Sequence, residues 1–434
     1  MGFSKRTRAG GAAKDVLSEN SPATIAPPSS TIYKAYRYEI QPTRGQLELC
    51  RKHVGVARFT YNWGLARRIE EYKETGKSSS AITQSKQLNA LKAEEFPWMY
   101  EVSKCAPQEA LRNLDRAYKN FYRRVKQGKK PGFPRFKKRG VARDSCRFTG
   151  TIKVMHRKVQ VPRLGRLRTK ECTEKFHGRI LSATLSREAD RWFVSVSVEC
   201  EIPGPRPVRG PVVGVDLGIT AFAVLSDGTS IEGPKALERH LDLLARRQRQ
   251  HARKQRGSKN RRKSAMRLAR LHRRVRNVRT DFIHKVTTRL CRENQTVVVE
   301  DLSVRNMMGN RSLARRIADQ GWGEFRRQLD YKTKWYGSRL VVAPRFYPSS
   351  KTCSACGQVK VRLTLAERTF TCDVCGLEID RDLNAARNLR QLSTGSSPGR
   401  NACGDGRRPA MPRKRKRRQP SRKQESAVSE MITV

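Results

Sequence analysis

Three acidic residues stand at positions where a carboxylate has little structural use. Asp216 interrupts an apolar run, Glu300 follows another, and Asp382 comes shortly after a group of cysteines. A lone acid in a buried strand costs free energy unless it meets a cation or a basic partner. Three carboxylates that meet could hold two divalent cations about 4 Å apart, which clamp the attacking water and leaving oxygen of a phosphodiester. Taken singly, each acid could equally be a salt-bridged structural residue.

Four cysteines form two Cys-x-x-Cys pairs separated by fifteen residues: Cys353, Cys356, Cys372 and Cys375. Each pair can offer two thiolates to one tetrahedral zinc ion, and a closed set of four protein ligands predicts a structural metal. Redox dithiols are the alternative, but Gly357 and Gly376 after the second cysteine of each pair favour a zinc ribbon. We expect this ribbon to fix the start of the helix that presents Asp382. Alternatively, Asp380 to Asp382 is a charged first turn that the helix dipole favours.

The composition predicts a polyanionic partner. The formal net charge is +54, from 93 Lys and Arg against 39 Asp and Glu. Such a chain repels itself unless phosphates neutralise it, so nucleic acid is the expected partner. A membrane fits poorly, because there is no apolar run of about 18 residues and no secretory signal. In a chain this long, with four of its eleven cysteines at zinc spacing, we expect a reducing interior rather than a disulfide scaffold.

The first half predicts a strand, three helices and then β-structure. Residues 33–40 alternate as a strand, and Pro42 and Thr43 open a helix that Gly76 ends. Further helical patterns cover 84–95 and 106–126. The last of these has an apolar face and a basic face, which suits a nucleic-acid clamp, although a solvated charged face is the alternative. The residues expected on the apolar face are Leu111, Leu114, Tyr118, Phe121, Tyr122 and Val125.

A basic loop joins these helices to the β-region. In residues 128–139, Phe133 and Phe136 lie among basic residues, so they could stack on bases or plug the loop into the core. Residues 180–187 and 191–201 predict a hairpin. The prolines between 203 and 211 predict a domain boundary.

The second half predicts buried strands interrupted by basic helices. Residues 212–219 predict an apolar strand with Asp216 inside it, and a second buried strand begins at Thr296 and ends at Glu300. Residues 221–225 and 230–231 continue the first strand as a meander. Residues 234–290 predict helices, with sixteen Lys and Arg but no acid between Arg246 and Thr280. Phosphate backbone is the expected counterion of this helix pair. The apolar stripe expected to be buried comprises Leu268, Leu271, Val275, Val278, Phe282 and Val286. Residues 311–336 predict a further helix, with Trp322, Phe325, Leu329 and Trp335 in the core.

At these motifs the chain resembles the TnpB family of transposon-encoded, RNA-guided DNA nucleases, which are related to type V CRISPR effectors. The motifs are Gly-Val-Asp-Leu-Gly around Asp216, Val-Glu-Asp-Leu around Glu300, Tyr-Pro-Ser-Ser before the cysteines, and Asp-Arg-Asp-x-Asn-Ala-Ala-x-Asn around Asp382. The match covers about residues 32–392. It implies that the three acids are catalytic and bind two Mg²⁺, and that one structural Zn²⁺ occupies the four cysteines.

The resemblance also implies a multidomain α+β fold: an N-terminal β-barrel wedge with an inserted helical recognition domain, then a split RuvC-like nuclease domain of ribonuclease-H fold with an inserted zinc ribbon. The expected segments are 1–30 disordered, 31–43 wedge strand, 44–128 recognition domain, 129–203 wedge domain, 204–345 nuclease domain with basic helices, 346–379 zinc ribbon, 380–392 last nuclease segment and 393–434 disordered basic tail.

The implied function is RNA-guided cleavage of double-stranded DNA beside a short target-adjacent motif, with a guide RNA from the transposon end. We expect a monomer bound to one RNA, in a prokaryotic cytoplasm near the nucleoid. Candidate contacts to the motif are Tyr61, Asn62, Lys104 and Gln108. Two rival functions use the same sequence features: a transposase that joins DNA strands without a guide, and a non-catalytic nucleic-acid-binding regulator whose acids are structural.

Overall fold

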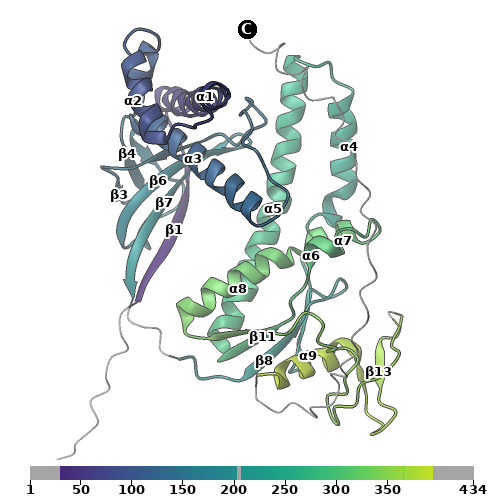
Figure 1. Cartoon of the computed structure of the whole chain (residues 1–434). Coiled ribbons are helices and arrows are strands. Elements are labelled where there is room, and N and C mark those ends of the chain that lie inside the picture. The colour runs from purple at the N-terminus through teal and green to yellow at the C-terminus, as the bar shows by residue number, and fades with distance from the viewer. Residues whose placement is uncertain (1–29, 203–206, 365, 394–434) are drawn as a thin grey trace, which may run out of the picture. The chain divides into compact units, whose positions relative to one another are not determined.

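A computed structural model of the chain describes residues 30–202, 207–364 and 366–393 (Figure 1). The predicted disordered segments 1–30 and 393–434 fall almost wholly outside these residues, as does part of the proline-rich linker. In the part of the chain that is described, no helix is long and apolar enough to cross a membrane.

The N-terminal region contains an antiparallel sheet of order β1-β7-β6-β2. Its strands are β1 (Ser30–Ile40), β2 (Ser145–Phe148), β6 (Arg179–Glu188) and β7 (Arg191–Ile202). Alternate residues Val194, Val196 and Val198 of β7 are buried, as period-2 strands require. The predicted hairpin is confirmed, and its turn carries Ala189 in the left-handed region at φ 55°. A second antiparallel sheet comprises β3 (Lys153–Met155), β4 (Lys158–Val161) and β5 (Gly165–Arg168).

Between β1 and β2 the chain forms the predicted helices: α1 (Arg44–Thr75), α2 (Ala81–Leu91), a 3-10 turn η1 (Pro97–Glu101) and α3 (Cys105–Lys126). Thr43 and Gln46 form a capping box at the start of α1, and Gly76 ends it in the left-handed conformation at φ 68°. Side-chain caps and a C-terminal glycine satisfy backbone groups that a helix leaves unpaired, which is why these boundaries were readable from the sequence.

The apolar face predicted for α3 is correct only in its first half. Leu111, Leu114 and Tyr118 are buried, but Tyr122 and Val125 are 47% and 50% exposed. The helix extends beyond the elements that cover its first turns, so spacing alone overestimated the buried face. Phe133 of the basic loop lies against the uncovered part, with its ring centroid 5.5 Å from that of Phe121. For Phe133, this contact favours the alternative in which the phenylalanine docks the loop on the protein rather than stacking on a base. Its side chain is nevertheless half exposed.

The C-terminal region is built on a five-stranded sheet of order β10-β9-β8-β11-β12. Strands β8, β11 and β12 are parallel, whereas β9 and β10 are antiparallel. The strands are β8 (Val212–Asp216), β9 (Ala223–Leu225), β10 (Ser230–Ile231), β11 (Thr296–Val299) and β12 (Arg339–Val342). Every residue of β11 is buried, as expected for a central strand covered on both faces.

Helices cover both faces of this sheet. The helices of this region are η2 (Glu238–His240), α4 (Leu241–Ala252), α5 (Lys259–Glu293), α6 (Val304–Met307), α7 (Ala314–Gln320), α8 (Trp322–Tyr336) and α9 (Arg381–Gln391). Ile283 of α5 and Phe325 of α8 pack with Val297 on one side. On the other side, Leu389 of α9 packs on Val298.

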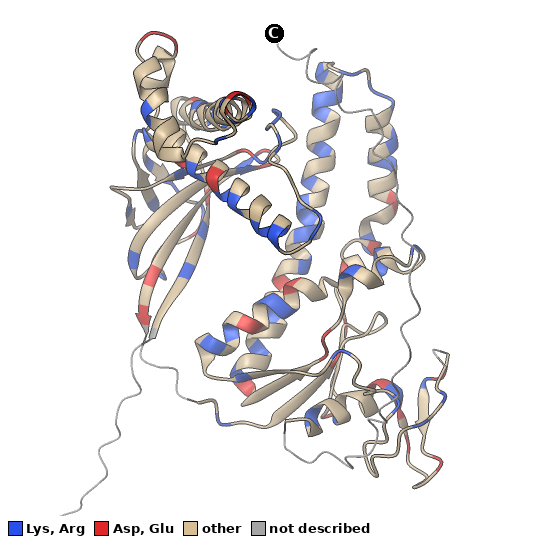
Figure 2. Cartoon of the chain, viewed as in Figure 1, with Lys and Arg blue, Asp and Glu red and all other residues tan. Residues whose placement is uncertain are grey.

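The basic helices α4 and α5 are confirmed, and Figure 2 shows Lys and Arg distributed along both. Leu271, Val275 and Val286 form the predicted buried stripe, but Val278 is 41% exposed. Because α5 is 35 residues long, only parts of its apolar side find a partner.

Candidate functional site

Two of the three predicted acids lie side by side at one edge of the C-terminal sheet. Val215 of β8 is the register partner of Val299 of β11, and the two strands are parallel. The next residues along the chain are Asp216 and Glu300, so both carboxylates leave the sheet at the same edge. Asp216 is the last residue of its strand, not a mid-strand residue as the sequence suggested.

The third acid arrives on α9, which packs closely on β8. A Cβ atom at Gly214 would lie 2.0 Å from the carbonyl oxygen of Ala386, so only glycine allows this approach. This contact brings the first turn of α9, with Asp382, to the edge where β8 ends.

Two acids at the start of α9, Asp380 and Asp382, have different roles. The carboxylate of Asp380 accepts hydrogen bonds from the backbone N–H groups of Asp382 and Leu383, at 3.0 and 2.9 Å. Asp380 is therefore the helix cap. The Asp382 side chain is not used for capping and instead forms an ion pair with Arg381, with N and O atoms 3.0 Å apart.

The three carboxylates share one open groove. Asp216, Glu300 and Asp382 all line it, together with residues of the loop before the cysteines. Burial raises the pKa of Asp216 well above its usual value, and the nearby charges of Glu300 and Asp382 raise it further. Mutual repulsion of this kind requires that the groups lie close together. The convergence predicted from the sequence is therefore present in the fold.

Ser349 of the Tyr-Pro-Ser-Ser motif holds one of these carboxylates, a role that the sequence did not predict. The hydroxyl of Ser349 donates to Oε1 of Glu300 at 2.5 Å. Nδ2 of Asn388 donates to the backbone oxygen of Ser349 at 2.7 Å. Ser349 and Asn388 are both buried. Through these bonds, the helix that carries Asp382 also holds the residue that orients Glu300.

The four cysteines come together before α9. Their sulfur atoms all lie within 4.8 Å of one another, a set that fits one tetrahedral zinc ion. The glycine after each pair is left-handed, Gly357 at φ 79° and Gly376 at φ 68°, which explains their presence. Hydrogen bonds from the backbone N–H groups of Cys375 and Val374 lower the pKa of Cys372 to about 6, which favours its thiolate.

The cysteine cluster is joined to α9 in two ways. Strand β13 (Thr369–Thr371) pairs with β14 (Glu378–Asp380), and α9 begins at the next residue. In addition, Asn384 accepts from the N–H of Ser354 at 2.9 Å and donates to the oxygen of Thr352 at 2.7 Å. The signal for these bonds was the Asn-Ala-Ala-x-Asn motif, whose two asparagines are four residues apart and so lie on one face of the helix.

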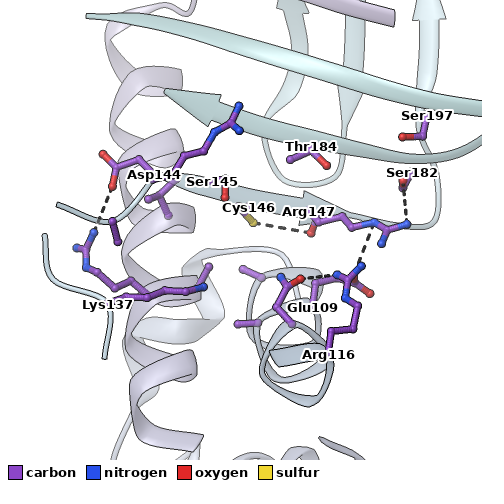
Figure 3. Close-up of a pocket in the computed structure, with 18 residues that line it drawn as sticks. Glu109, Arg116, Lys137, Asp144, Ser145, Cys146, Arg147, Ser182, Thr184 and Ser197 are labelled. Carbon is purple, nitrogen blue, oxygen red and sulfur yellow. Dashed lines mark hydrogen bonds and ion pairs between the residues drawn. The ribbon is translucent and has the colours of Figure 1, made fainter. Parts of the chain in front are cut away.

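A second cavity lies between α1, α3 and β2, and Figure 3 shows its lining. The buried carboxylate of Glu109 pairs with Arg112 at 2.6 Å and lies 3.7 Å from Arg147. Asp144 pairs with Arg58 at 3.4 Å. Each carboxylate here has an arginine partner.

The four candidate contacts to a DNA motif lie on α1 and around the start of α3. Tyr61 is buried, with Nζ of Lys137 3.8 Å from its ring centroid. Asn62 exchanges two hydrogen bonds with the backbone of Lys137, at 3.1 and 2.8 Å. Lys104 is exposed and Gln108 is half-buried. Tyr61 and Asn62 thus already hold the basic loop, and their contact with DNA stays a prediction.

Three family profiles match separate parts of the chain. Residues 195–311 match a profile described as "Probable transposase", and 322–389 match a Cas12f1-like TNB domain. Residues 30–77 match a profile described as a helix-turn-helix domain. In this chain those residues are strand β1 and the single long helix α1. The profiles define the class, that of transposase-related proteins that carry a Cas12f1-like domain.

Similar proteins narrow this class to a family. The chain is 40% identical to a Streptomyces pristinaespiralis protein named "Putative RNA-guided DNA endonuclease", over 87% of this chain and 92% of that one. An Escherichia coli protein with the same description is 33% identical, over 82% and 91%. A solved Cas12f1–sgRNA–target DNA complex matches with a TM-score of 0.49 at 16% identity, over 83% of this chain and 99% of that one. The chain belongs to the TnpB family.

Proposed function

We propose that this protein is an RNA-guided endonuclease that cleaves double-stranded DNA beside a short target-adjacent motif, with a guide RNA from the transposon end. The observation that carries the proposal is the groove where Asp216, Glu300 and Asp382 converge. A basic chain has no structural need for three adjacent carboxylates, whereas hydrolysis of a phosphodiester does. The relatives named as RNA-guided DNA endonucleases, which align over most of both chains, support the same activity.

Divalent cations fit the donor set of this groove. Carboxylate oxygens are the ligands that Mg²⁺ prefers, and two Mg²⁺ ions would offset the burial and the repulsion from Glu300 and Asp382 that raise the pKa of Asp216. Asp216, Glu300 and Asp382 would hold them, and the bound metals would supply activation of water and stabilisation of the leaving oxygen. Ser349 orients Glu300 through its hydroxyl. The sulfur set of the four cysteines fits one structural Zn²⁺, which stabilises the segment that leads into α9.

The connectivity supports the proposed domain assignment. Strand β1 pairs with β7, although the helices α1 to α3 lie between them in sequence. This pairing supports a wedge domain made of 31–43 and 129–203, with 44–128 inserted as the recognition domain. The sheet order β10-β9-β8-β11-β12 supports a ribonuclease-H fold for 204–345 and 380–392, with the ribbon 346–379 between them. The two small N-terminal sheets would form the wedge barrel.

The basic surfaces suit the backbone of a guide–target duplex. Sixteen Lys and Arg lie between Arg246 and Thr280, with no acid among them. Such helices bind phosphates without reading sequence, which the pairing of guide and target supplies. Tyr61, Asn62, Lys104 and Gln108 remain our candidates for contacts to the target-adjacent motif.

The test is Asp382→Ala in protein purified with its co-expressed RNA. We expect loss of DNA cleavage with DNA binding retained, while Asp227→Ala, an exposed turn acid, cleaves normally. Equal cleavage by Asp382→Ala refutes the assignment. Strand-joined products from RNA-free protein and transposon ends would support the transposase instead, and metal-independent behaviour throughout would support a regulator.

A further inference from the structure

One large apolar side chain at the acidic groove has no role in the chemistry above. Phe346 lines the groove that contains the three carboxylates, and its side chain is 92% exposed. Single exposed apolar residues are common on protein surfaces and need no explanation by themselves. Phe346 differs because its position is fixed by the backbone and because its neighbours suit one kind of ligand.

The backbone holds Phe346 outward. The N–H of Tyr347 donates to the oxygen of Pro344 at 3.0 Å, which closes a turn with Arg345 and Phe346 at its two central positions. Tyr347 points inward, where it packs beside Val298 and its hydroxyl donates to the Asn388 oxygen at 3.4 Å. With the interior taken by Tyr347, the aromatic ring of Phe346 is presented to solvent at the groove.

The flanking residues anchor the turn on both sides. Arg345 donates to the carboxylate of Asp301 at 2.6 Å, and Asp301 directly follows Glu300. On the other side, Ser349 bonds to Glu300 itself. The turn that carries Phe346 is therefore held next to one of the proposed metal ligands.

Other parts of the groove are lined by positively charged side chains. Arg316, Lys351 and Arg368 line it and are exposed. An aromatic ring beside basic side chains is the combination that binds single-stranded nucleic acid, because the ring stacks on a base while the cations hold the backbone. A paired duplex covers its base faces and offers the ring no such surface.

We propose that Phe346 stacks on an unpaired base of the DNA strand in the acidic groove and so sets which phosphate reaches the carboxylates. The effect on cleavage rests on the proposed function, whereas binding of the base does not. Phe346 is a positioning residue in this scheme. Loss of one base–aromatic stack weakens binding by about 5- to 100-fold.

The first experiment pairs Phe346→Ala with DNA substrates that lack one base at successive positions near the cut. For the wild type, we expect one abasic position to reduce cleavage or shift the cut site, whereas Phe346→Ala is impaired on intact DNA and indifferent to that position. Phe346→Trp should restore the wild-type pattern. Val361→Ala removes an equally exposed side chain, 91%, that does not line the groove, and should change nothing. Equal sensitivity of wild type and Phe346→Ala at every position overturns the proposal.

The second experiment needs no cleavage. A single-stranded DNA with one 2-aminopurine is bound in 0.5 M salt, where phosphate contacts weaken but stacking persists. We expect fluorescence quenching by Asp382→Ala protein and its loss in Asp382→Ala/Phe346→Ala, with an unchanged dependence of affinity on salt. The same quenching in both proteins refutes the stack. If the wild type binds and quenches but never cuts, the nuclease proposal fails and the base-binding proposal stands.

Discussion

The cavity between α1, α3 and β2 and the groove at the edge of the C-terminal sheet both contain carboxylates, and they differ in how the negative charge is balanced. In the cavity between α1, α3 and β2, Glu109 and Asp144 each lie beside arginine side chains (Figure 3). In the groove at the edge of the C-terminal sheet, three carboxylates converge, and Arg381 pairs with one of them.

The difference separates structural acids from acids that need a ligand. A buried carboxylate with an arginine partner is compensated within the fold, and removing one partner leaves an uncompensated charge. Burial and the neighbouring carboxylates of Glu300 and Asp382 raise the pKa of Asp216, and a cation would relieve that repulsion. Substitutions in the two cavities should therefore have opposite consequences for stability and activity.

Asp216→Asn should give the largest effect. We expect cleavage to fall at least about 1000-fold, because a catalytic metal contributes several kcal/mol. Without metal, the variant should unfold at a temperature no lower than the wild type, since the amide removes repulsion from Glu300 and Asp382. Single-turnover cleavage and thermal unfolding in chelator measure both. Asp227→Asn is the control, and a clear loss of stability in Asp216→Asn would contradict the comparison.

Cys372→Ser should have the next largest effect. We expect loss of bound zinc and a fall in cleavage of about 10- to 100-fold, because the ribbon and its asparagine contacts support α9 and Asp382. Metal analysis and cleavage rates on the same preparation test this. Cys172→Ser, an exposed cysteine outside the cluster, should keep both its zinc and its activity. A zinc-free variant that cuts at the normal rate would disprove the link.

Ser349→Ala should reduce cleavage by about 10-fold, the lower end for residues that orient a metal ligand. The loss comes from a less ordered Glu300 carboxylate, so a higher Mg²⁺ concentration should recover part of the rate. Magnesium titrations of cleavage measure it, with Ser350→Ala as the matched control. An unchanged magnesium requirement would remove Ser349 from the positioning role.

Glu109→Gln should leave cleavage by the purified complex unchanged and affect only stability. We expect a loss of about 1–2 kcal/mol, because Arg112 and Arg147 lose a charged hydrogen-bond partner. Glu101→Gln breaks an exposed pair with Lys52, which solvent screens, and should cost clearly less stability than Glu109→Gln. Denaturant unfolding of the two variants measures both losses of unfolding free energy. Equal losses would mean that the buried ion pairs of Glu109 stabilise the fold no more than the exposed pair does.

Much of the secondary structure was readable from the sequence because its signals are local. Thr43 and Gly76 gave the ends of α1, and alternation in 180–187 and 191–201 gave the hairpin. The exposed Tyr122 and Val125 show the limit of this reasoning. Periodicity tells which residues share a face of a helix, but the neighbours that cover that face come from elsewhere in the chain.

The sequence by itself determined which groups are available: three acids in apolar or structured contexts, four cysteines at zinc spacing and a large excess of basic side chains. Only the tertiary structure decided that Asp380 is a cap while Asp382 turns to the groove, that Ser349 holds Glu300, and that Phe346 faces outward. The reason is physical. Residue type and spacing fix local geometry, whereas the meeting of β8, β11 and α9 depends on parallel strand register and on the close approach that Gly214 allows.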